Sequence, residues 1–322
     1  MKARFITALL HISLEEDLGR GDKLDEVTFV TNNQDAIRSL LDREIVHQIG
    51  ALEADAILKA GAVVYSTEEL PDGADGQARL ARRLAEVQTF ENVLWLVRDN
   101  CVNNELGFLV CYDGSRVGVH SNFLSPVFTL ANGKTERTAF SREELRWARH
   151  FVRDRILRIE DSLEPTTRLS GSVDRTARAM YHVQAARAIG DLGIKIASYC
   201  SALESLFATS QAELSHQLAE RVASFLGVGP SDRLAKYKAL KAAYSIRSRI
   251  VHGDVLKAGH RETLPGLSSE CDGLVRGSLR KLFEDEEIRN RFRGSAEELD
   301  AFMISLLFGD ENESLRRSPV EK

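Results

Sequence analysis

A polar segment over residues 160–172 divides this chain into two stretches whose apolar residues recur with different periods. The segment contains Pro165 and Gly171 among serines, threonines and charged residues, a composition typical of interdomain linkers. Before it, runs with strand-like alternation mix with helical spacing; after it, only the three-to-four-residue helical spacing is present. The sequence therefore predicts an α+β protein: a mixed α/β domain over residues 1–165, an all-helical bundle over 172–309 and a loose charged tail over 310–322.

The N-terminal stretch predicts both strands and helices. Asp113 and Gly114 mark a turn between two strands, and a capping box of Ser141 and Glu144 begins a helix that should run to about Ile159. The expected strands cover residues 3–14, 26–30, 62–65, 106–112 and 116–120, and the expected helices cover 35–41, 77–97 and 141–159.

The C-terminal stretch predicts helices joined by short polar loops, which is typical of an antiparallel bundle. The first is expected as one long helix, in which Gly190 and Gly193 either introduce a bend or allow another helix to approach closely. Gly227 and Gly253 are placed to end two of the later helices. The expected helices cover residues 173–208, 211–226, 231–252, 267–283 and 296–307.

The composition argues against several classes of protein. With 322 residues, 43% of them hydrophobic and 28% charged, the chain can bury a core and keep a solvated surface. No apolar run approaches the roughly 20 residues of a membrane span, and acidic residues follow the apolar residues 5–10 where a signal peptide would have its cleavage site. The four cysteines form no Cys-x-x-Cys pair, which favours a reducing, cytoplasmic location.

Several chemistries lack their usual motifs. The sequence contains no His-Glu-x-x-His segment, no acidic calcium loop, no Gly-rich phosphate loop and no Gly-x-Ser-x-Gly nucleophile segment. We therefore expect neither a metal nor a cofactor.

Residues 233–261 differ in charge from the rest of the chain. Eight basic residues and one acid, Asp254, give this segment +7, whereas the whole chain carries −5. Such a segment can attract phosphate by electrostatics that do not depend on sequence, or it can be an ordinary solvated face. The basic residues are Arg233, Lys236, Lys238, Lys241, Arg247, Arg249, Lys257 and Arg261.

The most specific pattern lies within this basic segment. Residues 244–253 read Tyr-Ser-Ile-Arg-Ser-Arg-Ile-Val-His-Gly, so Arg247 precedes His252 by five positions. Two blocks on the preceding predicted helices accompany it, Ser201–Phe207 and Leu218–Gly227. In this order the three blocks resemble the ApeA-like branch of the HEPN superfamily, over about residues 189–253 of this chain.

The resemblance implies both a fold and an activity. HEPN domains are small helical bundles, and many are metal-independent endoribonucleases with an Arg-x4–6-His motif, to which Arg247 and His252 would belong as catalytic residues. The position after the arginine is usually polar, as Ser248 is. Family members commonly dimerise so that two motifs meet in one cleft, and many act in toxin–antitoxin, CRISPR or phage-defence systems. Some relatives are inactive and serve as binding or interaction modules.

The chemistry of these residue types agrees with the resemblance. RNA can be cut without a metal when its own 2′-hydroxyl attacks the adjacent phosphate. Histidine titrates near neutrality and can act as acid or base, and arginine stays protonated and can hold a phosphate through two hydrogen bonds. DNA has no 2′-hydroxyl and should not be cut by this route.

Other residues are assigned supporting or binding roles. Glu204 lies among apolar residues and needs a partner, for which Arg247 and Arg221 are the candidates; we favour a structural role that orients the arginine over direct chemistry. Tyr244 could stack on a base, although a core position is the commoner role. The predicted supporting residues are Ser248, Glu204 and Arg221, and the predicted RNA-binding residues are Arg249, Lys241 and Tyr244.

The spacing of the motif raises a geometric difficulty. Five helical positions place Arg247 and His252 about 140° apart around the helix axis. Three solutions remain open: His252 lies at the frayed helix end, Arg247 reaches around the helix, or the two residues meet across a dimer interface. The simpler alternative is that His252 only caps the helix and that Arg247 and Arg249 are surface charges.

The sequence thus predicts a metal-independent endoribonuclease of HEPN type, in the setting of a toxin or phage-defence effector. Its expected partners are RNA, a second copy of the chain and a possible regulatory protein, with no membrane contact. The alternative is a catalytically inactive HEPN module that binds RNA or a nucleotide or mediates dimerisation.

Overall fold

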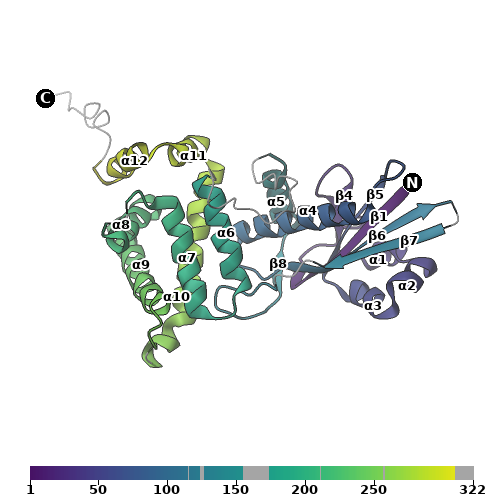
Figure 1. The fold of residues 1–322 in the computed structure, drawn as a ribbon, viewed down its shortest axis with the longest axis horizontal. Helices are drawn as coiled ribbons and strands as arrows, with labels where there is room; N and C mark the ends of the chain where they lie inside the picture. Colours follow the sequence, from purple (N-terminus) through teal and green to yellow (C-terminus); the bar gives the residue numbers. More distant parts are fainter. Residues whose placement is uncertain (115, 124–126, 155–173, 211, 257, 309–322) are drawn as a thin grey trace. The chain divides into compact units, whose positions relative to one another are not determined.

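A computed structural model describes residues 1–114, 116–123, 127–154, 174–210, 212–256 and 258–308. The chain divides into two compact units, Met1–Leu130 with Lys134–Glu164 and Ala131–Gly133 with Pro165–Lys322. The first contains a β-sheet with helices and the second contains helices, which confirms the predicted α+β class (Figure 1). The predicted linker over 160–172 and the predicted tail over 310–322 lie outside the described residues, so the domain boundary stays a prediction.

The core of the first unit is a six-stranded antiparallel sheet in the order β3-β4-β5-β1-β6-β7. The central strand β1 pairs with β5 and β6, so that Ile6 lies opposite Tyr65 on one side and Phe108 on the other. The six strands are β1 (Lys2–Leu10), β3 (Asp22–Lys23), β4 (Thr28–Thr31), β5 (Ala62–Glu69), β6 (Asn103–Asp113) and β7 (Arg116–Phe123).

Helices cover both faces of this sheet (Figure 1). On one face, α1 (Gln34–Leu40), α2 (Arg43–Ile49) and α3 (Ala51–Lys59) form a buried apolar core with strand residues that include Ile6. On the other face lies α4 (Gly76–Val97). Its Leu84 approaches β6 so closely that a Cβ at Gly107 would lie 2.6 Å from the Leu84 Cδ2 atom. The absence of a side chain at that position therefore allows the contact.

The predicted capping box is confirmed at the start of α5 (Arg142–Asp154). The Ser141 amide donates to the Glu144 carboxylate at 2.9 Å, and the Glu144 amide donates to the Ser141 hydroxyl at 3.3 Å. This pattern satisfies backbone donors that the first helical turn leaves open. The short strand β8 (Thr138–Phe140) precedes this helix and pairs in parallel with β2 (Ile12–Leu14).

The second unit is built around α7, most of whose apolar side chains are fully buried. This helix packs against α6, α8, α9 and α10. Phe207 of α7 also contacts the rings of Phe225 and Phe292, which joins the last helices to the bundle. The helices are α6 (Arg175–Ala188), α7 (Leu192–Phe207), α8 (Leu214–Leu226), α9 (Pro230–Val251), α10 (Ala258–Glu284), α11 (Glu286–Arg293) and α12 (Ala296–Phe308).

The prediction of one long helix over 173–208 is wrong. The chain leaves the helix after Ala188, and α7 begins with Asp191 as its N-cap, whose side chain accepts from the Ile194 amide at 2.9 Å. Because α6 turns back and packs on α7, one expected helix becomes an antiparallel pair. Within the described ranges, no helix is long and apolar enough to cross a bilayer.

Candidate functional site

The Arg-x4-His segment forms the last turns of α9. The helix ends at His252, whose amide donates to the Ser248 carbonyl at 3.0 Å. Gly253 follows with a φ of +79°, a left-handed conformation that is costly for residues with a Cβ. The helix therefore ends where the glycine predicts, and His252 occupies the C-cap.

Arg247 projects toward α7 and pairs with Glu204. A terminal nitrogen of the guanidinium lies 3.2 Å from a carboxylate oxygen, and the two side chains are 26% and 18% exposed. The same guanidinium lies over the ring of Tyr244, 5.1 Å from its centroid. Of the two candidate partners for Glu204, the structure brings Arg247 to it, and an acid and an aromatic ring together fix the arginine.

Burial dominates the electrostatics around Glu204. Loss of water raises the pKa of this carboxyl group, against the opposing effects of the Arg247 charge and of the Tyr244 hydroxyl. Burial and the nearby Glu204 raise the pKa of Tyr244 to about 12, and the same two causes raise the pKa of the Cys200 thiol to about 12. Both Tyr244 and Cys200 are therefore neutral at physiological pH, and this thiol is not a nucleophile.

His252 is exposed, and its imidazole makes no hydrogen bond, ion pair or ring contact with any described residue. Only its backbone caps the helix, so capping does not occupy its ring nitrogens. Arg247 faces the bundle while His252 lies at the exposed end of α9. Nothing in the described part of the chain joins the two side chains directly, in keeping with their separation of about 140° around the helix.

Arg221, the other candidate partner of Glu204, lies in a different environment. It donates to the Phe207 carbonyl at 2.7 Å and forms an ion pair with Asp300 of α12. A cation at the C-terminus of a helix is stabilised there by the helix dipole, so Arg221 holds α7, α8 and α12 together. It does not pair with Glu204.

The predicted RNA-binding residues are spread along α9. Lys241 is exposed and donates to the Ser215 hydroxyl of α8 at 3.0 Å. Ser248 and Arg249 are half-buried, and Tyr244 contacts Arg247. Lys257, a member of the basic segment, lies outside the described residues.

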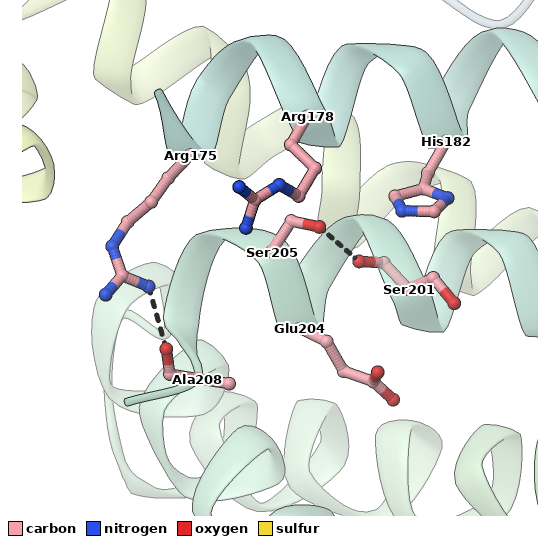
Figure 2. Close-up of a pocket in the computed structure, with 7 residues that line it drawn as sticks. All are labelled: Arg175, Arg178, His182, Ser201, Glu204, Ser205 and Ala208. Atoms are coloured by element: carbon pink, nitrogen blue, oxygen red, sulfur yellow. Dashed lines mark hydrogen bonds between the residues drawn. The ribbon is translucent and has the colours of Figure 1, made fainter. Parts of the chain in front are cut away.

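A groove between α6 and α7 was not anticipated from the sequence. It has a volume of about 490 Å³ and is open to solvent. Figure 2 shows the residues that line it. The sequence contained one indication of this groove, the helical spacing of three basic residues on α6: Arg175, Arg178 and His182. The groove was not predicted because an unbroken helix over 173–208 would keep these residues away from Ser201 and Ser205. The lining residues are Arg175, Arg178, His182, Ser201, Glu204, Ser205 and Ala208.

Comparisons with protein-family models, with curated proteins and with solved structures find no match to this chain. The resemblance to HEPN domains therefore rests on the residues of α7, α8 and α9 alone. Among the described residues, no group of three or more histidine, cysteine or acidic side chains is arranged to hold a metal ion.

Proposed function

We propose that this chain is a metal-independent endoribonuclease of HEPN type that acts as a homodimer. One observation carries the proposal: α9 ends in an exposed histidine with an unoccupied imidazole, five residues after an arginine fixed by Glu204 and Tyr244. An oriented guanidinium and an accessible imidazole are the two groups that this cleavage requires. The resemblance implies a toxin or phage-defence setting, in which the N-terminal unit or a partner protein would restrain or target the activity.

The proposed reaction uses the RNA's own 2′-oxygen as nucleophile. As the 2′-oxygen bonds to phosphorus, its proton passes to solvent, and Arg247 stabilises the extra negative charge on the phosphoryl oxygens. The bond from phosphorus to the 5′-oxygen breaks, and protonated His252 donates its proton to that oxygen. The products are a 2′,3′-cyclic phosphate and a 5′-hydroxyl.

The test is incubation of the purified full chain with mixed cellular RNA in the presence of EDTA. His252→Ala removes the proton donor and should lower the cleavage rate by about 10²–10⁴-fold. Arg247→Ala should cost about 10²–10³-fold. His216→Ala, a histidine that is also exposed but lies on α8, is the matched control and should leave the rate unchanged. Cleavage that EDTA abolishes, or that survives His252→Ala, refutes the mechanism.

A mixing experiment tests whether two copies share a site. If Arg247 of one copy acts with His252 of the other, mixing equal amounts of inactive Arg247→Ala and His252→Ala chains restores one intact site in each mixed dimer. Half of the dimers are mixed, so the activity should return to about a quarter of the wild-type value. Sites formed within a single chain would give no recovery.

A module that binds RNA without cutting it is the second candidate. The engagement of Arg247 by Glu204 favours it, because a paired arginine is less available to a phosphate. The same assay separates the two proposals: RNA that is bound at high affinity and stays intact indicates a binding module.

A further inference from the structure

The groove between α6 and α7 presents two arginines and a histidine in a row. Arg175, Arg178 and His182 extend from α6 toward α7, where Ser201 and Ser205 face them (Figure 2). Residues 175 and 182 are separated by about 10 Å along the helix axis, at 1.5 Å per residue. The row is therefore longer than one phosphate group.

Little acidic charge offsets this row. Arg178 is half-buried, its side chain forms no ion pair or hydrogen bond with any described residue, and its buried Nε atom has no acceptor. Glu204, the acid in the groove lining, points away from Arg178 in Figure 2 and pairs with Arg247. The groove is therefore electropositive.

The neighbouring cations repel one another. Burial lowers the pKa of Arg175, and the charges of Arg178 and Arg221 lower it further; Asp300 opposes them. Burial and Arg178 also lower the pKa of His182, so this imidazole is neutral at physiological pH and the charge of the row comes from the two arginines. An anion placed among these side chains would relieve both the repulsion and the unsatisfied donor of Arg178.

The lining favours an extended anion over a compact ligand. Sites for small organic ligands are mostly enclosed and apolar, whereas this groove is open and its lining residues are polar except for Ala208. Open cationic grooves are the usual means of following a nucleic-acid backbone. Glu204 lies at the edge of the groove and also contacts Arg247, so the groove adjoins the proposed catalytic arginine.

We propose that the α6–α7 groove binds the phosphodiester backbone of the RNA strand next to the cleavage site, with Arg178 as its main phosphate contact. The identity of the ligand rests on the proposed function, whereas the preference for an extended anion rests on the groove. Arg175 already donates to the Ala208 carbonyl at 2.7 Å, so it contributes mainly its charge.

The test measures binding separately from cleavage. The probe is a fluorescent 2′-O-methyl RNA of about 12 nucleotides, a length within the range that single-strand grooves cover. It has no free 2′-hydroxyl and cannot be cut. Arg178→Gln should weaken its binding about tenfold, as expected for loss of a charged hydrogen bond. The slope of log K against log salt should fall in magnitude by about 0.7, as for one lost phosphate contact on a single strand.

Arg291→Gln is the matched control, because Arg291 is an exposed arginine of α11 whose loss removes the same charge from the chain. It should leave binding nearly unchanged, and Arg178→Lys should recover part of the affinity. Equal effects of Arg178→Gln and Arg291→Gln overturn the proposal. A second outcome also overturns the proposal: a mononucleotide or pyrophosphate binds in a way that depends on Arg178, and the RNA cannot displace it. That outcome indicates a site for a small ligand.

The failures of the two proposals are distinguishable. If natural RNA is bound through Arg178 but stays intact, the groove proposal stands and the endoribonuclease proposal fails. If RNA is cut with the predicted dependence on His252 while Arg178→Gln binds like wild type, the groove proposal fails and the endoribonuclease proposal stands.

Discussion

Replacing Glu204 by glutamine separates the orientation of Arg247 from the stability of the bundle. The amide oxygen of glutamine can still accept a hydrogen bond from the guanidinium 3.2 Å away, but the negative charge is lost. We expect Glu204→Gln to change the free energy of unfolding at pH 7 by less than about 1 kcal/mol, because the amide keeps the hydrogen bond and burial already costs the carboxylate more than its neighbours return. RNA cleavage should nevertheless decrease.

The magnitudes follow from the raised pKa of Glu204. Burial costs this carboxylate more than the attraction of Arg247 and the Tyr244 hydroxyl returns, so its charge adds no net stability. A hydrogen bond to a charged acceptor is about twice as strong as one to a neutral acceptor. The interaction that holds the Arg247 guanidinium in place therefore weakens by about 1 kcal/mol. The turnover rate should therefore fall about fivefold with little change in KM. Glu204→Ala removes the acceptor as well and should destabilise the fold by about 2 kcal/mol.

The pH dependence has a definite sign. The pKa of Glu204 is higher in the folded chain than in the unfolded chain, where it is about 4.3. Its contribution to stability is therefore fully present below pH 4 and is lost as pH rises through the raised value. Measured by urea unfolding, the stability of the wild type minus that of Glu204→Gln should fall across this range and then level off. The reasoning would be refuted if this difference in stability grew with pH, or if Glu204→Gln lowered the free energy of unfolding by more than about 2 kcal/mol at pH 7.

Three further substitutions test the bundle, each by urea unfolding followed by circular dichroism. Asp272→Ala should cost about 3 kcal/mol, because the carboxylate is buried, accepts from the Tyr199 hydroxyl at 3.0 Å and pairs with Arg276; a loss below 1 kcal/mol would contradict this. Asp191→Ala should cost about 1 kcal/mol through loss of the α7 N-cap. Gly253→Ala should cost about 1 kcal/mol, because its φ of +79° disfavours a Cβ.

Long periodic segments were predictable from the sequence, and most of the short ones were not. The alternation or β-branching of β1, β5 and β6 and the spacing of α4 identified those elements, because each runs long enough to show its period. The strands β3 and β8 have two or three residues each and show no period, whereas β2 falls within the strand predicted over 3–14, which the structure divides at His11 with its φ of +57°. The helices α2 and α3 were not predicted, although α1, which is as short as α2, was; a single residue, Gly50, separates α2 from α3.

The missed break at residues 189–191 explains why the groove was not predicted. Apolar spacing continues through this turn because α6 and α7 both bury a face in the same bundle. The local signal was present, since Gly190 and Asp191 form a stop followed by an N-cap. This turn brings Arg178 of α6 opposite Ser205 of α7 (Figure 2).

The angle between the two residues of the motif was predictable from the sequence, but the contacts of Arg247 were not. The angle between Arg247 and His252 depends only on α9 remaining helical, which it does through Val251. Which arginine Glu204 would meet depends on how α8 and α9 pack against α7, and the sequence left both Arg247 and Arg221 as candidates. Glu204 lines the α6–α7 groove and pairs with Arg247, so an RNA strand bound in the groove as proposed would pass close to Arg247. On our proposal, the proton donor at that phosphate is then the His252 of a second copy, which makes the mixing experiment the sharpest test of the assembled site.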